Sequence, residues 1–83
     1  MVGANQAEEE AVRFLINQPT PEQIIAFHPS AGVAARFYDL VDAEREHALS
    51  SEEQHEMETF LYIEHMMRLL KAAAHQVLQE KAS

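Results

Sequence analysis

The feature that most constrains this 83-residue chain is an uninterrupted stretch that begins at Ser51 and reaches about Lys81. It contains no glycine and no proline, the two residues that most often end helices. We therefore predict a helix of about 30 residues, which is roughly 45 Å long at 1.5 Å per residue. A domain of this size is only about 25 to 30 Å across. Part of the helix should protrude or pack against a second copy of the chain.

Apolar residues cover an unusually wide face of this predicted helix. One row has the alternating three- and four-residue spacing of coiled-coil core positions, and it consists of Phe60, Ile63, Met67, Leu70, Ala74 and Val77. A second set widens the face, namely Leu61, Met66, Leu69, Ala73 and Leu78. One side of the helix can pack against the rest of the chain while its flank contacts a partner; in the alternative, three short helices cover the whole face in a monomer. The predicted association surface lies at or near Phe60, Ile63, Met66, Met67 and Leu70.

Two of these residues are methionines, whose side chains adapt to irregular partner surfaces. Met66 and Met67 are adjacent, so they point about 100° apart on a helix. They cannot both face the same core layer, and one of them is the best single candidate for an interface contact.

Three shorter helices are predicted before the long one, over about residues 6–17, 21–27 and 31–47. Each predicted helix follows a side chain that can accept a hydrogen bond from the first turn, and these N-caps are Asn5, Thr20, Ser30 and Ser50. Gln23 and Glu53 have the spacing that completes capping boxes with Thr20 and Ser50. The expected apolar face is Ala11, Val12, Leu15 and Ile16 in the first helix, and Val33, Ala34, Phe37, Leu40 and Val41 in the third. The expected fold is all-α, a small bundle of three to four helices with a long C-terminal helix, forming a single helical domain over residues 1–83.

The charge of the chain limits the partners that it can bind. It has 14 acidic and 6 basic residues and a formal net charge of −8, and its basic residues are spread along the sequence. Such a chain repels a phosphate backbone and an anionic lipid surface. This disfavours direct binding to nucleic acid, including the role of a DNA-binding adaptor, and to membranes. A basic protein partner is compatible with the charge.

The sequence also favours a cytoplasmic location. Residues 1–10 lack the positive and apolar segments of a secretory signal, and no apolar run approaches the roughly 18 residues needed to span a bilayer. Without cysteine the chain has no disulfide to stabilise it. A chain this short gains additional burial most readily by forming a homo-oligomer or by packing on a partner.

No residue pattern indicates an enzyme. There is no cysteine nucleophile, the serines are accounted for as helix caps, and no glycine-rich loop is present to hold a phosphate. Glu44-x-x-His47 and Glu52-x-x-His55 have the spacing of di-iron carboxylate ligands, but both pairs flank a predicted exposed loop instead of facing into a bundle. We therefore predict no catalytic residues, no metal site and no cofactor. The alternative is a small metal- or cofactor-binding helical protein that uses these four residues.

Two segments carry a pattern that amphipathicity alone does not explain: Leu49-Ser50-Ser51-Glu52-Glu53 and Glu64-His65-Met66-Met67-Arg68-Leu69-Leu70-Lys71-Ala72. With them, residues 19–74 resemble small uncharacterised bacterial helical proteins, often cyanobacterial, that share L-S-x-E-E followed by L-E-H-L-M-R-L-x-K-A. Some members of that group are regarded as antitoxin-like or as partners of nucleases. The resemblance thus implies an interaction role and supplies no enzymatic activity. The group tends to have a glycine in the turn where this chain has His47-Ala48.

These observations favour a non-enzymatic helical protein–protein interaction module that forms a homodimer through its long final helix. The most specific version of this hypothesis is antitoxin-like or regulatory binding of a basic protein partner.

Overall fold

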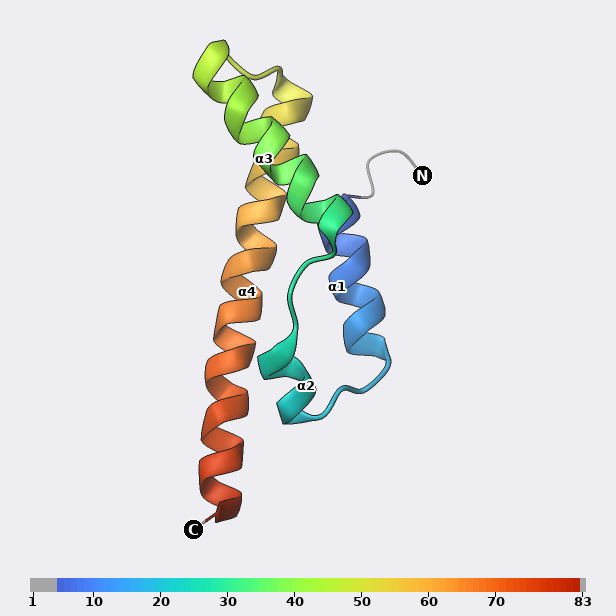
Figure 1. Cartoon of the computed structure of the whole chain (residues 1–83), viewed down its shortest axis with the longest axis vertical. Helices are drawn as coiled ribbons and strands as arrows, with labels where there is room; N and C mark the ends of the chain where they lie inside the picture. The colour runs from blue at the N-terminus through green and yellow to red at the C-terminus, as the bar shows by residue number, and fades with distance from the viewer. Residues whose placement is uncertain (1–4, 83) are drawn as a thin grey trace.

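The computed structural model describes residues 5–82, which form four α-helices and no β-strand. In chain order these are α1 (Gln6–Ile16), α2 (Pro21–Ala26), α3 (Ala31–Glu46) and α4 (Ser51–Ala82) (Figure 1). The predicted all-α fold with a long C-terminal helix is confirmed. None of the helices in this part of the chain is both long and apolar enough to cross a membrane. The start of the chain, on which the prediction about a secretory signal partly rests, lies outside the described residues.

Each helix begins where the sequence predicts, because a side chain satisfies the free N–H groups of its first turn. Thr20 and Gln23 form a reciprocal capping box, in which the Thr20 hydroxyl accepts from the Gln23 N–H at 3.2 Å and the Gln23 side chain accepts from the Thr20 N–H at 2.9 Å. Ser50 and Glu53 do the same at 3.1 and 3.0 Å. Accepting the Ser50 N–H also lowers the pKa of the Glu53 carboxyl. Single side-chain caps are provided by Asn5 and Ser30.

α4 organises the fold, since each of the three shorter helices packs against it, α2 most extensively. α3 lies across the N-terminal part of α4, and α2 lies beside its C-terminal half (Figure 1). The described chain measures 52 × 27 × 19 Å, and the last turns of α4 extend beyond α2. The predicted protrusion of the long helix is thus confirmed.

The core is small and sits where α1, α3 and α4 meet. Its buried cluster consists of Ala7, Val33, Leu40, Met57 and Phe60. Leu40, at 1% exposure, is the most deeply buried large side chain. The ring of Phe37 packs edge-on against that of Phe60, with centroids 5.8 Å apart. The predicted apolar face of the third helix is confirmed, because its five residues are all buried or half-buried.

The buried face of α1 differs from the sequence prediction. Val12 and Ile16 are 57% and 75% exposed, whereas Ala7 and Ala11 are buried. The predicted face containing Val12 and Ile16 is therefore wrong for these two residues. The small alanine side chains let the α1 backbone come close to its neighbours, and the larger residues are turned toward solvent.

Contacts at its two ends hold α1 in this orientation. At the start, the Asn5 side-chain amide donates to the Glu56 backbone carbonyl of α4 at 3.2 Å. At the other end, the Phe14 ring lies 4.5 Å from that of Phe27. Both contacts join residues far apart in sequence, which explains why the spacing of apolar residues within α1 did not reveal them.

The loop between α1 and α2 and the loop between α3 and α4 differ in backbone strain. Gln18, two residues after the end of α1, has φ 55°, in the left-handed region that disfavours side chains with a Cβ. His47, directly after α3, is extended at φ −162° and ψ 170°, a conformation open to any residue. The turn at His47-Ala48 therefore needs no glycine.

Candidate functional site

α4 carries two apolar faces, of which the fold covers only one. Its buried residues are Met57, Phe60, Met67 and Ala74. A second row points away from the other helices, and we call Tyr62, Met66, Leu69 and Ala73 the α4 stripe. Tyr62 is 60% exposed, Leu69 59% and Met66 36%, and Ala73 is also exposed. The four-, three- and four-residue steps between them keep the row on one side of the helix, as in a coiled-coil seam.

The five residues of the predicted association surface fall into three groups. Phe60 and Met67 are each only 6% exposed because the core of the same chain covers them. Ile63 and Leu70 are half-buried along the edge of the α4 stripe, and Met66 lies within it. Of the two adjacent methionines, Met66 is thus the one turned outward.

The sequence reasoning missed Tyr62, and it named Leu69 and Ala73 only as widening the apolar face. The signal was present, since residues 62, 66, 69 and 73 repeat the alternating three- and four-residue spacing of the row that runs from Phe60 to Val77. Two overlapping rows with one spacing cannot be ranked from the sequence, because the ranking depends on which row the other helices cover.

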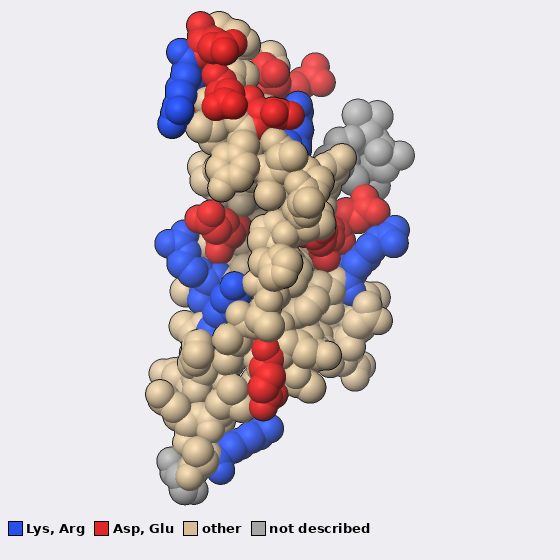
Figure 2. Space-filling view, in the orientation of Figure 1, with Lys and Arg blue, Asp and Glu red and all other residues tan. Residues whose placement is uncertain are grey.

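A concentrated negative charge marks one end of the molecule. Eight of the 14 acidic residues but only one of the 6 basic residues lie between positions 39 and 58. These residues form the end of α3, the turn and the start of α4, and Figure 2 shows the acidic side chains gathered there. We call residues 39–58 the acidic end.

One glutamate of the acidic end, Glu56, pairs with Arg36 and ties α4 to α3. Arg36 donates from Nε and from a terminal nitrogen to the two carboxylate oxygens of Glu56, both at 2.8 Å. The side chains are 39% and 26% exposed, respectively. The hydrogen bonds from Arg36 lower the pKa of the Glu56 carboxyl. Because both charges are used internally, this pair is a structural contact and is not available to a partner.

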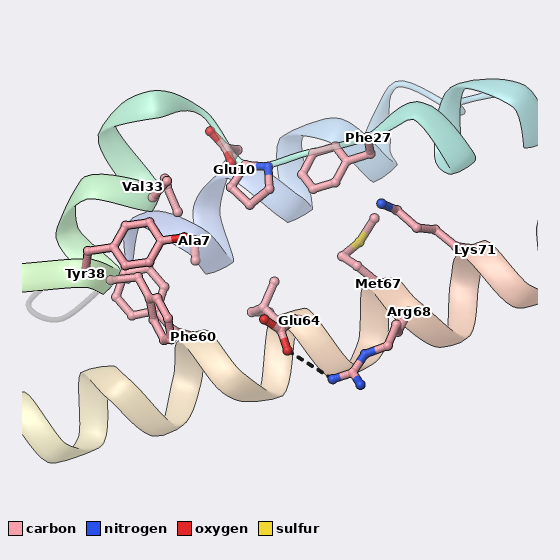
Figure 3. Close-up of a pocket in the computed structure, with 14 residues that line it drawn as sticks. Ala7, Glu10, Phe27, Val33, Tyr38, Phe60, Glu64, Met67, Arg68 and Lys71 are labelled. Atoms are coloured by element: carbon pink, nitrogen blue, oxygen red, sulfur yellow. Dashed lines mark hydrogen bonds and ion pairs between the residues drawn. The ribbon is translucent and has the colours of Figure 1, made fainter. Parts of the chain in front are cut away.

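A pocket of about 340 Å³ opens between α1, the segment after α2, α3 and α4 (Figure 3). Apolar side chains form most of its wall, among them Phe27, Val33, Phe60 and Met67. Its volume is at the lower end of the range typical of small-molecule sites. The pocket can hold a small apolar group.

The polar side chains around this pocket mostly contact other parts of the chain. Glu10 accepts from the Ser30 backbone N–H at 3.1 and 3.2 Å. Glu64 and Arg68 form an exposed ion pair at 3.0 Å. Lys71 extends from α4 toward the pocket beside Met67 (Figure 3). These groups can orient a bound molecule at the rim, but the walls themselves are apolar.

The histidine and glutamate pairs of the alternative metal hypothesis do not assemble. Glu44, His47, Glu52 and His55 are all exposed. Within residues 5–82, no three His, Cys, Asp or Glu side chains come close enough together to hold a metal ion. The structure therefore gives that alternative no ligand set in the described part of the chain.

The fold and surface thus define an all-helical protein in which three short helices pack on one long helix that keeps an exposed apolar row. Comparison with known protein families, curated proteins and solved structures finds no match to this chain. The resemblance to the small bacterial proteins stays a prediction.

Proposed function

We propose that this chain is a non-enzymatic helical protein–protein interaction module that forms a homodimer through the α4 stripe. The observation that carries the proposal is the exposure of Tyr62, Met66 and Leu69 in one row on a helix whose other apolar face is already covered. Full burial of a side chain of this size is worth about 1.5–3 kcal/mol. Covering the exposed part of Leu69 alone then contributes about 1–2 kcal/mol, and a second copy offers the same gain from its own row.

The acidic end supports a second contact, with a basic protein partner. It lies at one end of the elongated molecule (Figure 2), whereas the α4 stripe runs along the middle of α4. A dimer can therefore form while the α3 part of the acidic end, including the exposed Glu44 and Glu46, stays uncovered. Antitoxin-like or regulatory binding of a basic protein is the specific role that this charge and the bacterial resemblance support.

Solution mass tests the dimer directly. We expect light scattering across micromolar concentrations to give about twice the 9.4 kDa of one chain. Leu69→Glu should reduce the mass to that of one chain while circular dichroism still shows a helical protein. Leu61→Glu is the matched control, because Leu61 is 47% exposed but lies outside the α4 stripe. A wild-type chain that stays monomeric throughout this range contradicts the proposed dimer.

The basic partner requires a separate test. A pull-down from the cell of origin is expected to recover a basic protein that is released as salt is raised, since salt screens charge contacts. Replacing Glu44 and Glu46 by Gln should weaken this capture without changing the dimer mass. Repeated recovery of the chain alone argues against this part of the proposal.

Binding of a small apolar molecule is a second candidate function, favoured only by the pocket of about 340 Å³. Ala34 lines this pocket and is half-buried, so Ala34→Leu fills part of it. A polarity-sensitive dye, anilinonaphthalene sulfonate, should gain fluorescence with the wild type and much less with the variant. Equal fluorescence with both proteins removes the pocket as the binding site.

A further inference from the structure

We infer that the two copies pair through antiparallel α4 helices, centred between Met66 and Leu69, so that Tyr62 of one copy packs against Ala73 of the other. The inference rests on the proposed self-association and adds the orientation and register of the partner helix. Three independent observations lead to it: the sizes of the residues in the α4 stripe, the residues beside it, and the placement of charge.

Residue size favours the antiparallel arrangement. Around the proposed centre, Met66 faces Leu69 of the second copy and Tyr62 faces Ala73, so every layer of the seam holds two medium side chains or one large and one small. A parallel pair in register places two Tyr62 side chains together at one layer and two Ala73 side chains at another. Since paired helices keep a nearly constant separation and interiors are densely packed, the parallel pair is overfilled at the first layer and hollow at the second.

The residues beside the stripe complete the same seam. In an antiparallel pair, the residues that flank one edge of the seam in one helix lie next to the residues that flank the same edge in the other helix. Here the register brings Ile63 next to Leu70 of the second copy. Both are half-buried in one chain, so the second copy covers the part that the fold leaves exposed. This places three of the five residues of the predicted association surface, Ile63, Met66 and Leu70, in one continuous contact.

Polar residues then end the seam on both sides. The same register sets Thr59 opposite Gln76 of the second copy and His55 opposite Glu80. His55 and Glu80 are both exposed, and their pairing joins a carboxylate to an imidazole that can donate to it. The apolar contact is thus bounded by residues that can form hydrogen bonds where water enters.

The distribution of charge gives the third reason. With eight acidic residues and one basic residue, the acidic end has a net charge of −7, or −6 once Arg36 is counted with its partner Glu56. A parallel pair brings two such ends together at the roughly 8–10 Å spacing of packed helices. An antiparallel pair separates the two starts of α4 by about 50 Å along the axis, well beyond the Debye length of about 10 Å at 0.1 M salt. Opposed helix dipoles add a smaller effect of the same sign.

Single cysteines can report the orientation, because the chain contains none of its own. Thr59→Cys and Gln76→Cys leave the apolar centre of the seam unchanged. In the proposed dimer, residue 59 of one copy lies opposite residue 76 of the other, one helix spacing away. In a parallel pair the same two positions are about 25 Å apart, and each lies opposite its own copy.

We expect a mixture of the two variants, treated with a short bismaleimide, to give a crosslinked dimer on a denaturing gel, and each variant alone to give little. Crosslinking of each variant with itself shows a parallel pair and overturns the inference. No crosslink in the mixture, from variants that light scattering shows to be dimers, shows another register or surface and also overturns it. Variants that are monomeric alongside a monomeric wild type instead refute the proposed dimer itself. Leu61→Cys, outside the seam, is the control for random collision.

Discussion

Replacing Leu40 by alanine tests whether the small core is what holds α1 and α3 on α4. Leu40 lies in α3 with 1% of its surface exposed, and it packs in the cluster that contains Ala7 of α1 and Phe60 of α4. The substitution removes three buried carbons at the one place where all three helices meet. It changes no charge and breaks no hydrogen bond.

We expect Leu40→Ala to lower the free energy of unfolding by about 3 kcal/mol. Comparable buried Leu→Ala changes cost about 2.7–5.0 kcal/mol, and the cost falls where neighbours can relax into the space. Val33 and Phe60 line both this cluster and the open pocket, so relaxation is available and the lower part of the range applies. A chain of this length has a total stability of only about 4–12 kcal/mol. The melting temperature should therefore fall by about 12–24 °C.

Urea unfolding followed by circular dichroism measures this change, at one protein concentration because self-association also contributes to stability. Leu61→Ala is the matched control: Leu61 is 47% exposed and outside the core, so its loss should cost less than about 1 kcal/mol. Equal costs for the two variants would show that Leu40 does not pack as described and would refute the reasoning.

Three further predictions concern polar contacts and backbone strain. Glu56→Gln should lower the free energy of unfolding, measured in urea, by about 1 kcal/mol, since the Arg36–Glu56 pair is partly exposed. The pKa of Glu56 is lowered from about 4.5 in the folded state. The stability that this pair gives the wild type is therefore present above that pH and is lost as pH falls below it. An unfolding midpoint that varies with pH equally in variant and wild type would count against this. Asn5→Ala should lower the free energy of unfolding by about 1–2 kcal/mol. It removes the acceptor for the Ala7 N–H and the donor to the Glu56 backbone carbonyl. An unchanged urea midpoint would exclude this. Gln18→Gly should raise stability by about 0.5 kcal/mol, because relief of strain at φ 55° exceeds the added freedom of the unfolded chain; a lower midpoint would show the opposite balance.

The surfaces proposed for binding were only partly visible in the sequence. The helical period alone predicts that Met66 and Met67 cannot share a core layer and that one of them is an interface candidate, but it does not say which. The predicted association surface contains both methionines and Phe60, yet Phe60 and Met67 are core residues of the same chain. The two rows on α4 have the same spacing, so the choice between them required the positions of α1, α2 and α3.

The acidic end and the pocket show the same division. Negative charge on residues 39–58 can be read from the sequence, but its gathering at one end depends on α3 and α4 being joined by a short turn. The pocket is lined by residues from α1, α3, α4 and the segment after α2. Nothing in the local sequence indicates that these residues meet.

The sequence by itself determined where the helices begin and how long the last one is. Capping bonds join residues about three positions apart, as in Ser50 and Glu53, and the absence of glycine and proline from the last helix is equally local. Only the tertiary structure decided which faces are buried, as with Val12 and Ile16, which are exposed on α1, and Met66 and Leu69, which form part of the α4 stripe. The physical reason is that hydrogen bonds within a helix fix its conformation over a few residues, whereas burial depends on contacts with helices far away in the sequence.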